Sequence, residues 1–245
     1  MTNTWVIPDI HGCVETLKTL IDVQIKPNKN DHLIFVGDYI DRGPDSKGVI
    51  DYIMWLQQND YNVTPLMGNH EEYCVKAWEK DRDKKSFFGF SSKSNIQKDW
   101  ERHGGKQTMA SFGVQRPREI PKVYIDWMRN LDHYIVLDEY VVVHAGLNFR
   151  IEDPFKDKRA MLWSRDYQIE PEKIGNRRVV HGHLPVNLEF IDLVVKNKDS
   201  YWFIDIDNGI YFSQKAGYGN LVALNLNKMD YVVQSLMDEI SFKSG

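Results

Sequence analysis

The first third of the chain alternates between short apolar runs and segments whose apolar residues recur at helical spacing. The runs Trp5–Ile7, Leu33–Val36 and Val63–Met67 have the length of strands, and apolar residues between them repeat every three or four positions. Strands that alternate with helices form parallel sheets through crossover connections. The pattern therefore predicts a β-α-β-α-β unit and an α/β fold.

The rest of the chain departs from this alternation. Residues from about 80 to 130 are polar with helical spacing, which predicts a helical insertion packed over one edge of the sheet. Further short strands are predicted at Tyr134–Leu137, Tyr140–Val143, Arg178–Val180, Trp202–Ile204, Leu221–Leu224 and Tyr231–Val233, the first two as a hairpin. Because no low-complexity linker interrupts the sequence, we expect one domain over residues 1–245, built as a helix-covered sandwich of two sheets.

The composition narrows the classes of function. Of 245 residues, 31 are basic and 35 acidic, so the net charge of −4 includes no basic excess that would indicate nucleic acid or anionic membrane as a partner. Two cysteines are too few for a disulfide framework or a thiolate zinc site. With no visible signal peptide and no apolar run of about 18 residues, the sequence predicts a cytoplasmic protein. It leaves the oligomeric state open.

Polar side chains gather directly after each of the first three predicted strands. Ligands of open α/β sheets bind beyond the carboxyl ends of the strands, and the spacing of about 30 residues between clusters matches one βαβ unit. We therefore expect the fold to bring together Asp9, His11, Asp38, Asn69 and His70. Carboxylate, imidazole and amide donors without a thiolate suit Mn, Fe, Zn or Co, with Mg also possible.

Two later apolar runs also end in histidine. His144 follows Val141–Val143, and His181 and His183 follow Val179–Val180. With Asp38 on the middle motif as the natural bridge, the five strand ends predict a pair of divalent cations that clamps a phosphoryl oxygen and generates a hydroxide for in-line attack.

Each cluster also has a purely structural interpretation. Asp9 and His11 suit an Asx-turn, Asp41 and Arg42 suit a surface ion pair, and Asn69 suits a helix cap. His144 alone is typical of a packed core histidine. These alternatives stay open for each motif by itself, but five such clusters at five strand ends favour a metal site for the set.

The motifs resemble those of the calcineurin-like metallophosphoesterases, in particular the phosphoprotein phosphatase branch and its short bacterial and phage members. The resemblance runs from about Trp5 to Leu226. It rests on Asp9-Ile10-His11-Gly12, Gly37-Asp38, Asp41-Arg42-Gly43, Gly68-Asn69-His70-Glu71 and His144-Ala145-Gly146. It implies a four-layer α/β (α+β) fold, a central β-sandwich of two mixed sheets flanked by α-helices, with metals at the sandwich edge.

The resemblance also implies a role for each matching position. The implied metal ligands are Asp9, His11, Asp38 as the bridge, Asn69, His144 and His183. His183 is preferred to His181 because the family's ligand precedes x-Pro, as in Gly182-His183-Leu184-Pro185. The implied general acid is His70, paired with Asp41, and the implied phosphate-binding residues are Arg42 and Arg165. Asp207 is interpreted as structural, and Pro8 stands where the family usually has glycine.

Three functions follow as hypotheses. The principal expectation is a serine/threonine protein phosphatase that hydrolyses phosphomonoesters with two divalent cations, manganese first and iron, zinc, cobalt or magnesium as alternatives. The second is symmetrical hydrolysis of bis(5'-nucleosyl) tetraphosphates, because the pattern Trp100, Gly104-Gly105, Thr108 resembles those enzymes. The third is a catalytically inactive module that binds phosphate or a partner. The expected substrate is accordingly a phosphoprotein or a small phosphorylated molecule.

Overall fold

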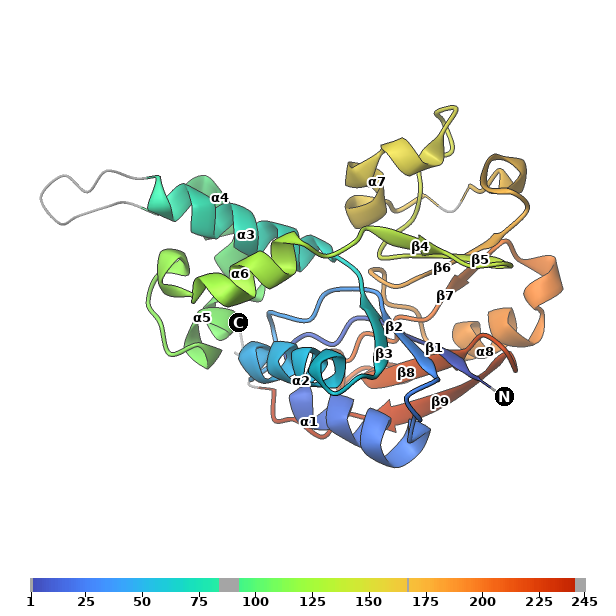
Figure 1. Ribbon diagram of the computed structural model, residues 1–245, viewed down its shortest axis with the longest axis horizontal. Helices are drawn as coiled ribbons and strands as arrows, with labels where there is room; N and C mark the ends of the chain where they lie inside the picture. Colours follow the sequence, from blue (N-terminus) through green and yellow to red (C-terminus); the bar gives the residue numbers. More distant parts are fainter. Residues whose placement is uncertain (1, 84–92, 167, 241–245) are drawn as a thin grey trace, which may run out of the picture.

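The strands form two sheets, shown in Figure 1 for the computed structural model, which describes residues 2–83, 93–166 and 168–240. The five-stranded sheet has the order β3-β2-β1-β8-β9, and the four-stranded sheet has the order β4-β5-β6-β7. The strands are β1 (Thr4–Ile7), β2 (His32–Phe35), β3 (Asn62–Pro65), β4 (Tyr134–Val136), β5 (Tyr140–Val143), β6 (Arg178–His181), β7 (Phe203–Asp205), β8 (Asn220–Asn225) and β9 (Asp230–Ser235).

Eight α-helices connect and cover these strands within the described residues. They are α1 (Val14–Lys18), α2 (Ser46–Gln58), α3 (Asn69–Arg82), α4 (Asn95–Trp100), α5 (Lys106–Ser111), α6 (Lys122–Arg129), α7 (Lys158–Trp163) and α8 (Leu188–Lys196). A π-helical segment, η1 (Thr19–Ile25), continues α1, and a second, η2 (Glu101–Gly105), joins α4 to α5. Short 3₁₀ turns are η3 (Pro117–Glu119), η4 (Pro154–Lys156), η5 (Pro171–Ile174) and η6 (Lys198–Ser200).

Both sheets are mixed. β1, β2 and β3 pair in parallel, which confirms the predicted β-α-β-α-β unit, and β8 and β9 add to β1 as an antiparallel hairpin. In the second sheet, β4 and β5 form the predicted hairpin, whereas β5, β6 and β7 are parallel. Since β1, β2, β3, β5 and β6 all end in the same region, five loops converge on one edge of the sandwich (Figure 1).

The alternation of side chains along each strand produces four layers. Val6 and Ile34 point into the apolar core between the sheets, where they join Val142 and Val180 of the second sheet. Ile7, on the opposite face of β1, packs in the core that includes residues of α1 and α2. The outer face of the second sheet packs against α7. The order helix, sheet, sheet, helix confirms the expected four-layer fold.

The predicted insertion consists of helices α4 to α6 beside the sheets (Figure 1). Helices α4 and α6 pack against α3, and α5 packs against α2. Residues 84–92, at the beginning of the insertion, lie outside the described residues. Its turn η2 also reaches the carboxyl ends of the strands: Gly104 has φ +117°, and a Cβ atom there would lie 2.4 Å from the backbone nitrogen of Arg42. Within the described residues no helix is long and apolar enough to span a bilayer.

Candidate metal centre and active site

The loops after β1, β2 and β3 are held together by their backbones. The amide of His11 donates to the carbonyl of Asp38 at 2.8 Å, and the amide of Gly12 donates to the carbonyl of Tyr39 at 2.8 Å. Gly37 has φ +109°, and a Cβ atom there would lie 2.4 Å from the nitrogen of Gly68. Only glycine permits this approach of the second and third loops. The side chains that follow these strands therefore have little freedom to separate.

Several residues of this region adopt left-handed backbone conformations. Positive φ values occur at His11 (47°), Asp38 (54°), Asp41 (73°), Arg42 (68°) and His183 (73°). For non-glycine residues this conformation costs about 1–2 kcal/mol each, and it persists only where the surrounding structure enforces it. Here all five residues either belong to the donor groups described below or contact a histidine of those groups.

One group of donor atoms lies around His11. Its Nε2 atom is 3.7 Å from Oδ2 of Asp38 and 3.9 Å from Oδ2 of Asp9, and all three side chains are buried. Its Nδ1 atom lies 2.9 Å from the carbonyl oxygen of Ile40, so Nδ1 carries the proton and Nε2 presents its lone pair to the carboxylates. This is the orientation of a metal-binding histidine.

A second group lies around His144. Its Nε2 atom is 2.9 Å from Oδ1 of Asn69, 3.2 Å from Nδ1 of His183 and 3.5 Å from Oδ1 of Asp38. Its Nδ1 atom is 3.0 Å from the carbonyl oxygen of Val36, which again leaves Nε2 facing the group. The donor atoms of Asp38, His144 and His183 all lie within 4.8 Å of one another, as do those of Asp38, His11 and His70. Asp38 is thus common to two candidate cation sites.

The imidazoles of both groups are held in their neutral, coordinating form. Burial lowers the pKa of His11, and the positive charges of Arg42 and His70 lower it further. Burial likewise lowers the pKa of His144. Burial and the neighbouring His144 lower the pKa of His183 to about 3. Neutral imidazole is the form that binds a cation.

The surroundings shift the pKa values of the two central carboxylates in opposite directions. Burial raises the pKa of Asp9, and the negative charges of Asp207 and Asp38 add to this effect. Burial also opposes ionisation of Asp38, but the imidazoles of His144 and His70 outweigh it and lower the pKa. Among the described residues, His183 Nε2 and Asp207 Oδ2 are buried polar atoms without a hydrogen-bond partner. A buried set of this kind, with neutral imidazoles beside crowded carboxylates, fits a divalent cation.

His70 and Asp41 form a buried pair at the side of this centre. Nδ1 of His70 lies 2.6 Å from Oδ2 of Asp41, and Nε2 lies 3.7 Å from Oδ2 of Asp38. Burial disfavours the charged imidazole, but Asp38 and Asp41 outweigh it and raise the pKa of His70. The insertion completes the pair: Trp100 Nε1 donates to Asp41 Oδ2 at 2.9 Å, and the hydroxyl of Thr108 donates to Asp41 Oδ1.

Sequence reasoning assigned no role to Trp100 or Thr108, although it noted the pattern that contains them. Glu71 is a third residue to which the sequence analysis assigned no role. The Glu71 carboxylate is buried and accepts hydrogen bonds from the amides of Asp38 (2.8 Å), Tyr39 (2.9 Å) and Gly68 (3.0 Å). The sequence does contain a signal for this role, because Glu71 stands three residues after Gly68 at the start of α3, the position of a capping-box glutamate. Glu71 fixes the loop that carries Asp38.

The two predicted phosphate-binding arginines differ in their surroundings. The Arg42 guanidinium lies 3.0 Å from Nε2 of His11 and 3.3 Å from Nε2 of His70, and it stacks 3.9 Å above the ring of Tyr211. Arg165 is exposed, and its charge contributes to the lowered pKa of His183. Both arginines therefore lie near the donor groups, Arg42 in contact and Arg165 at the rim. Tyr211 had no signal in the sequence.

Three further positions with a sequence-based interpretation are His181, Pro8 and Asp207. His181 is buried, and its Nδ1 atom lies 3.0 Å from the carbonyl oxygen of Gly182 and 4.0 Å from Oδ2 of Asp205, outside both donor groups. Pro8 directly follows β1, where no strand hydrogen bond is required of its nitrogen. Asp207 accepts from the amide of Gly209 at 2.7 Å, as a structural residue does, yet its charge also acts on Asp9.

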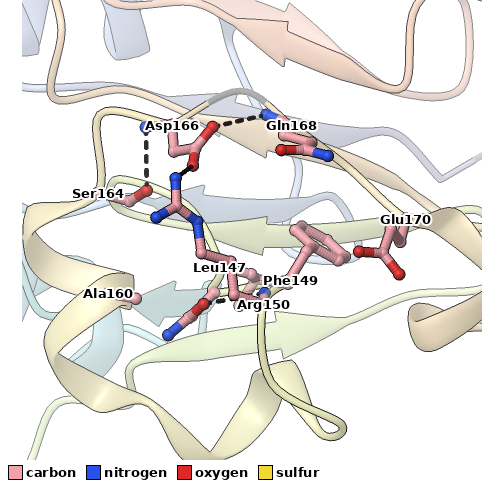
Figure 2. Close-up of a pocket in the computed structure, with 9 residues that line it drawn as sticks. Leu147, Phe149, Arg150, Ala160, Ser164, Asp166, Gln168 and Glu170 are labelled. Carbon is pink, nitrogen blue, oxygen red and sulfur yellow. Dashed lines mark hydrogen bonds and ion pairs between the residues drawn. The ribbon is translucent and has the colours of Figure 1, made fainter.

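A separate pocket of about 330 Å³ lies behind the loop that follows α7. Figure 2 shows the Arg150 guanidinium reaching Asp166 across it, an ion pair of 2.9 Å, with the carboxylate of Asp166 also accepting from the amide of Gln168. Its lining includes Leu147 and Phe149 but none of the donor residues. This pocket is therefore not the metal centre.

The family description "Calcineurin-like phosphoesterase" matches residues 2–207. The asymmetrical bis(5'-nucleosyl)-tetraphosphatase PrpE of Anoxybacillus flavithermus is 28% identical over 97% of this chain and 96% of its own length. The symmetrical bis(5'-nucleosyl)-tetraphosphatase of Buchnera aphidicola subsp. Schizaphis graminum is 33% identical over 84% of this chain, which spans 61% of that protein. Serine/threonine-protein phosphatase 1 of Salmonella typhimurium is 40% identical, but over 31% of this chain.

Solved structures agree on the fold. A putative diadenosine tetraphosphatase covers 95% of this chain, and this chain covers 92% of it, with a TM-score of 0.56 and 17% identity. A serine/threonine phosphatase from Saccharomyces cerevisiae covers 99% of this chain with a TM-score of 0.61 and 13% identity, and 82% of that chain is matched. The two sequence relatives above that match most of the chain carry the name of tetraphosphatases, so the comparisons favour the second hypothesis over the principal one. The chain belongs to the calcineurin-like phosphoesterase family and is a phosphoric ester hydrolase.

Proposed function

We propose that the protein hydrolyses dinucleoside polyphosphates at the donor groups around Asp38. The observation that carries the proposal is the contact of the insertion with the acid pair: Trp100 and Thr108 both hydrogen-bond the carboxylate of Asp41, which in turn holds His70. The segment whose pattern resembles tetraphosphatases is thus part of the reaction centre. The relative that matches nearly the whole chain carries the name of a tetraphosphatase, which supports the same substrate class.

Two divalent cations are assigned to the centre. Asp9 and His11 would hold one, Asn69, His144 and His183 would hold the other, and Asp38 would contact both. When bound, such cations would supply polarisation of the phosphoryl group and would lower the pKa of a water molecule. Manganese is our first candidate because carboxylate, imidazole and amide donors are mixed in one site without a thiolate.

The protein's own side chains supply the remaining functions. Arg42 places its guanidinium at the opening of the centre, where it binds an anionic phosphoryl oxygen, and Arg165 approaches from the rim. His70, with its Nδ1 proton held by Asp41, donates a proton from Nε2 to the departing oxygen. Asp41 keeps that imidazole oriented and favours its charged form. Trp100 and Thr108 hold Asp41 in place.

The experiment is a comparison of substrates with the purified protein and manganese. We expect kcat/KM for diadenosine tetraphosphate to exceed the values for a phosphoserine peptide and for p-nitrophenyl phosphate. Chromatography of the products identifies the bond that is cleaved: two ADP molecules indicate symmetrical cleavage, and ATP with AMP indicates asymmetrical cleavage. A higher kcat/KM for the phosphoserine peptide would contradict the proposal and return the protein-phosphatase hypothesis to first place.

A further inference from the structure

A wide cavity of about 780 Å³ opens beside the metal centre, between Arg42, Tyr211 and the turn that ends at Lys106. We propose that this cavity receives the departing nucleotide of a dinucleoside polyphosphate, with Arg102 and Lys106 binding its phosphates. This inference rests on the proposed function and assigns the half of the substrate that leaves.

The position of the cavity decides which half it receives. Arg42 belongs both to the cavity and to the reaction centre, because its guanidinium lies 3.3 Å from Nε2 of His70. Gly104, also in the cavity wall, lies against the backbone nitrogen of Arg42 and the Cβ atom of Asp41. Arg42 also lies 3.0 Å from Nε2 of His11. Gly104, however, adjoins Asp41, which holds His70, so the cavity opens beside the acid pair. A group that takes its proton from His70 must lie on that side when the bond breaks.

The charges of the wall suit a phosphate chain. Arg102 and Lys106 are exposed on successive turns of the η2–α5 segment, and both line the cavity. Arg102 pairs with Asp99 at 2.7 Å, whereas Lys106 has no ion-pair partner among the described residues. Two acids also line the cavity. Glu101 forms an ion pair with Lys93 at 2.7 Å, so Glu239 is the other negative charge in the cavity wall.

The size of the cavity favours a nucleotide over a single phosphate. A phosphoryl group is accommodated by Arg42 and the donor groups alone, but about 780 Å³ is within the range of sites that enclose a whole small-molecule ligand. The ring of Tyr211 stacks on the Arg42 guanidinium at 3.9 Å, and this contact holds the arginine side chain in place in the cavity wall. Arg42, Arg102 and Lys106 all line this cavity and supply its positive charge.

The chemical step is a hydrolysis without change of oxidation state. The oxygen of one water molecule bonds to the attacked phosphorus, and the bond from phosphorus to the bridging oxygen breaks with its electron pair on that oxygen. His70 gives its proton to the departing oxygen, and the proton released by the water restores His70. The nucleotide that carries the departing oxygen remains in the cavity until it dissociates.

The test uses the double variant Arg102→Gln/Lys106→Gln, the conservative variant Lys106→Arg, and the control Lys228→Gln. Lys228 is exposed in the turn between β8 and β9, at the opposite end of the sheet. The measurements are kcat/KM for diadenosine tetraphosphate and p-nitrophenyl phosphate, and inhibition of p-nitrophenyl phosphate hydrolysis by ADP and by inorganic phosphate.

In the double variant, we expect the ratio of the two kcat/KM values to fall about tenfold, the change expected when charged hydrogen bonds to a phosphate are lost. The inhibition constant of ADP should rise by a similar factor and that of inorganic phosphate by less. Lys106→Arg should retain the wild-type ratio, and Lys228→Gln should not change it. An unchanged ratio in the double variant, with wild-type protein active on diadenosine tetraphosphate, overturns the assignment of the cavity alone. Wild-type protein that hydrolyses p-nitrophenyl phosphate but not diadenosine tetraphosphate overturns the proposed function and this assignment together.

Discussion

The metal centre and the wall of the neighbouring cavity differ in how they are built. The donor side chains Asp9, His11, Asp38 and His144 are at most 2% exposed and come from loops that follow three different strands. The cavity wall consists largely of one local turn, on which Arg102 and Lys106 are exposed. The first region depends on long-range convergence, and the second depends on a few consecutive residues.

This difference separates chemistry from substrate choice. A buried donor set tolerates few changes, because each replacement leaves a neighbouring charge or imidazole without a partner. An exposed turn can change its side chains while the backbone stays in place. We therefore expect the metal centre to determine the reaction, which is hydrolysis of a phosphoric ester or anhydride bond. We expect the exposed turn to determine which substrate binds. The predictions below test this separation.

The largest effect is expected from Asp38→Asn, because Asp38 is common to both donor groups. Loss of its charge removes several kcal/mol of cation and transition-state stabilisation, so p-nitrophenyl phosphate turnover should fall by about three orders of magnitude. Metal analysis after dialysis should show fewer bound cations than in the wild type. Asp230→Asn, an exposed change at the far hairpin, serves as the control. Full metal content and normal turnover in Asp38→Asn would show that Asp38 does not bridge cations.

The next effect is expected from His70→Asn. Removal of the proton donor should lower kcat for diadenosine tetraphosphate about 10²–10³-fold, while metal content stays at the wild-type level. His32→Asn is the matched control, since His32 also makes a side-chain hydrogen bond, 2.8 Å from the hydroxyl of Thr64, but at the amino end of β2. If His70→Asn lost its metal instead, His70 would belong to the cation site and not to the acid pair.

A smaller effect is expected from Trp100→Phe, which removes the indole N–H that donates to Asp41. The loss of one hydrogen bond to a charged group should lower kcat about tenfold and leave metal content intact. Trp127→Phe is the control, because its indole donates at 3.1 Å to the side chain of Gln57 on an exposed surface. Equal activity of the two variants would mean that the hydrogen bond from Trp100 does not contribute to catalysis.

The smallest effect on activity is expected at the opposite end of the sheet. Asp31 accepts hydrogen bonds from the amides of Asn3 (2.7 Å) and Asn28 (3.0 Å). Burial opposes ionisation of Asp31, but these bonds outweigh it and lower its pKa. Because the folded-state pKa is below the unfolded value of about 3.9, this contribution to stability is present above pH 4 or so and is lost as the pH falls through the folded-state pKa.

Asp31→Ala should therefore reduce the free energy of unfolding by about 1–2 kcal/mol at pH 7 and by less below pH 3, with kcat unchanged. Urea unfolding of both proteins at pH 7 and at about pH 2 measures the difference. A loss of stability that is the same at both pH values would mean that the charge of Asp31 is not what stabilises the loop.

The sequence predicted the parts of the molecule that obey a local pattern. The parallel β1-β2-β3 unit, the β4–β5 hairpin and the helix-covered sandwich of two sheets follow from strand spacing and alternation, whereas the four-layer fold was implied by the family resemblance. The positions of the strand-end donors follow from the parallel order. The contacts of Trp100 and Thr108 with Asp41 span 59 and 67 residues, and no local pattern encodes such a distance. The same is true of Tyr211, which stacks on Arg42 from a segment with no recognisable motif. The roles assigned to the site residues, and the single-domain organisation over residues 1–245, stay predictions.

The left-handed conformations at His11, Asp38, Asp41, Arg42 and His183 have a consequence for glycine substitutions at these positions. Glycine would relieve about 1–2 kcal/mol of backbone strain, but it would also leave the neighbours of a buried polar side chain without a partner. The two effects oppose each other, so glycine variants should lose activity without a matching gain in thermal stability.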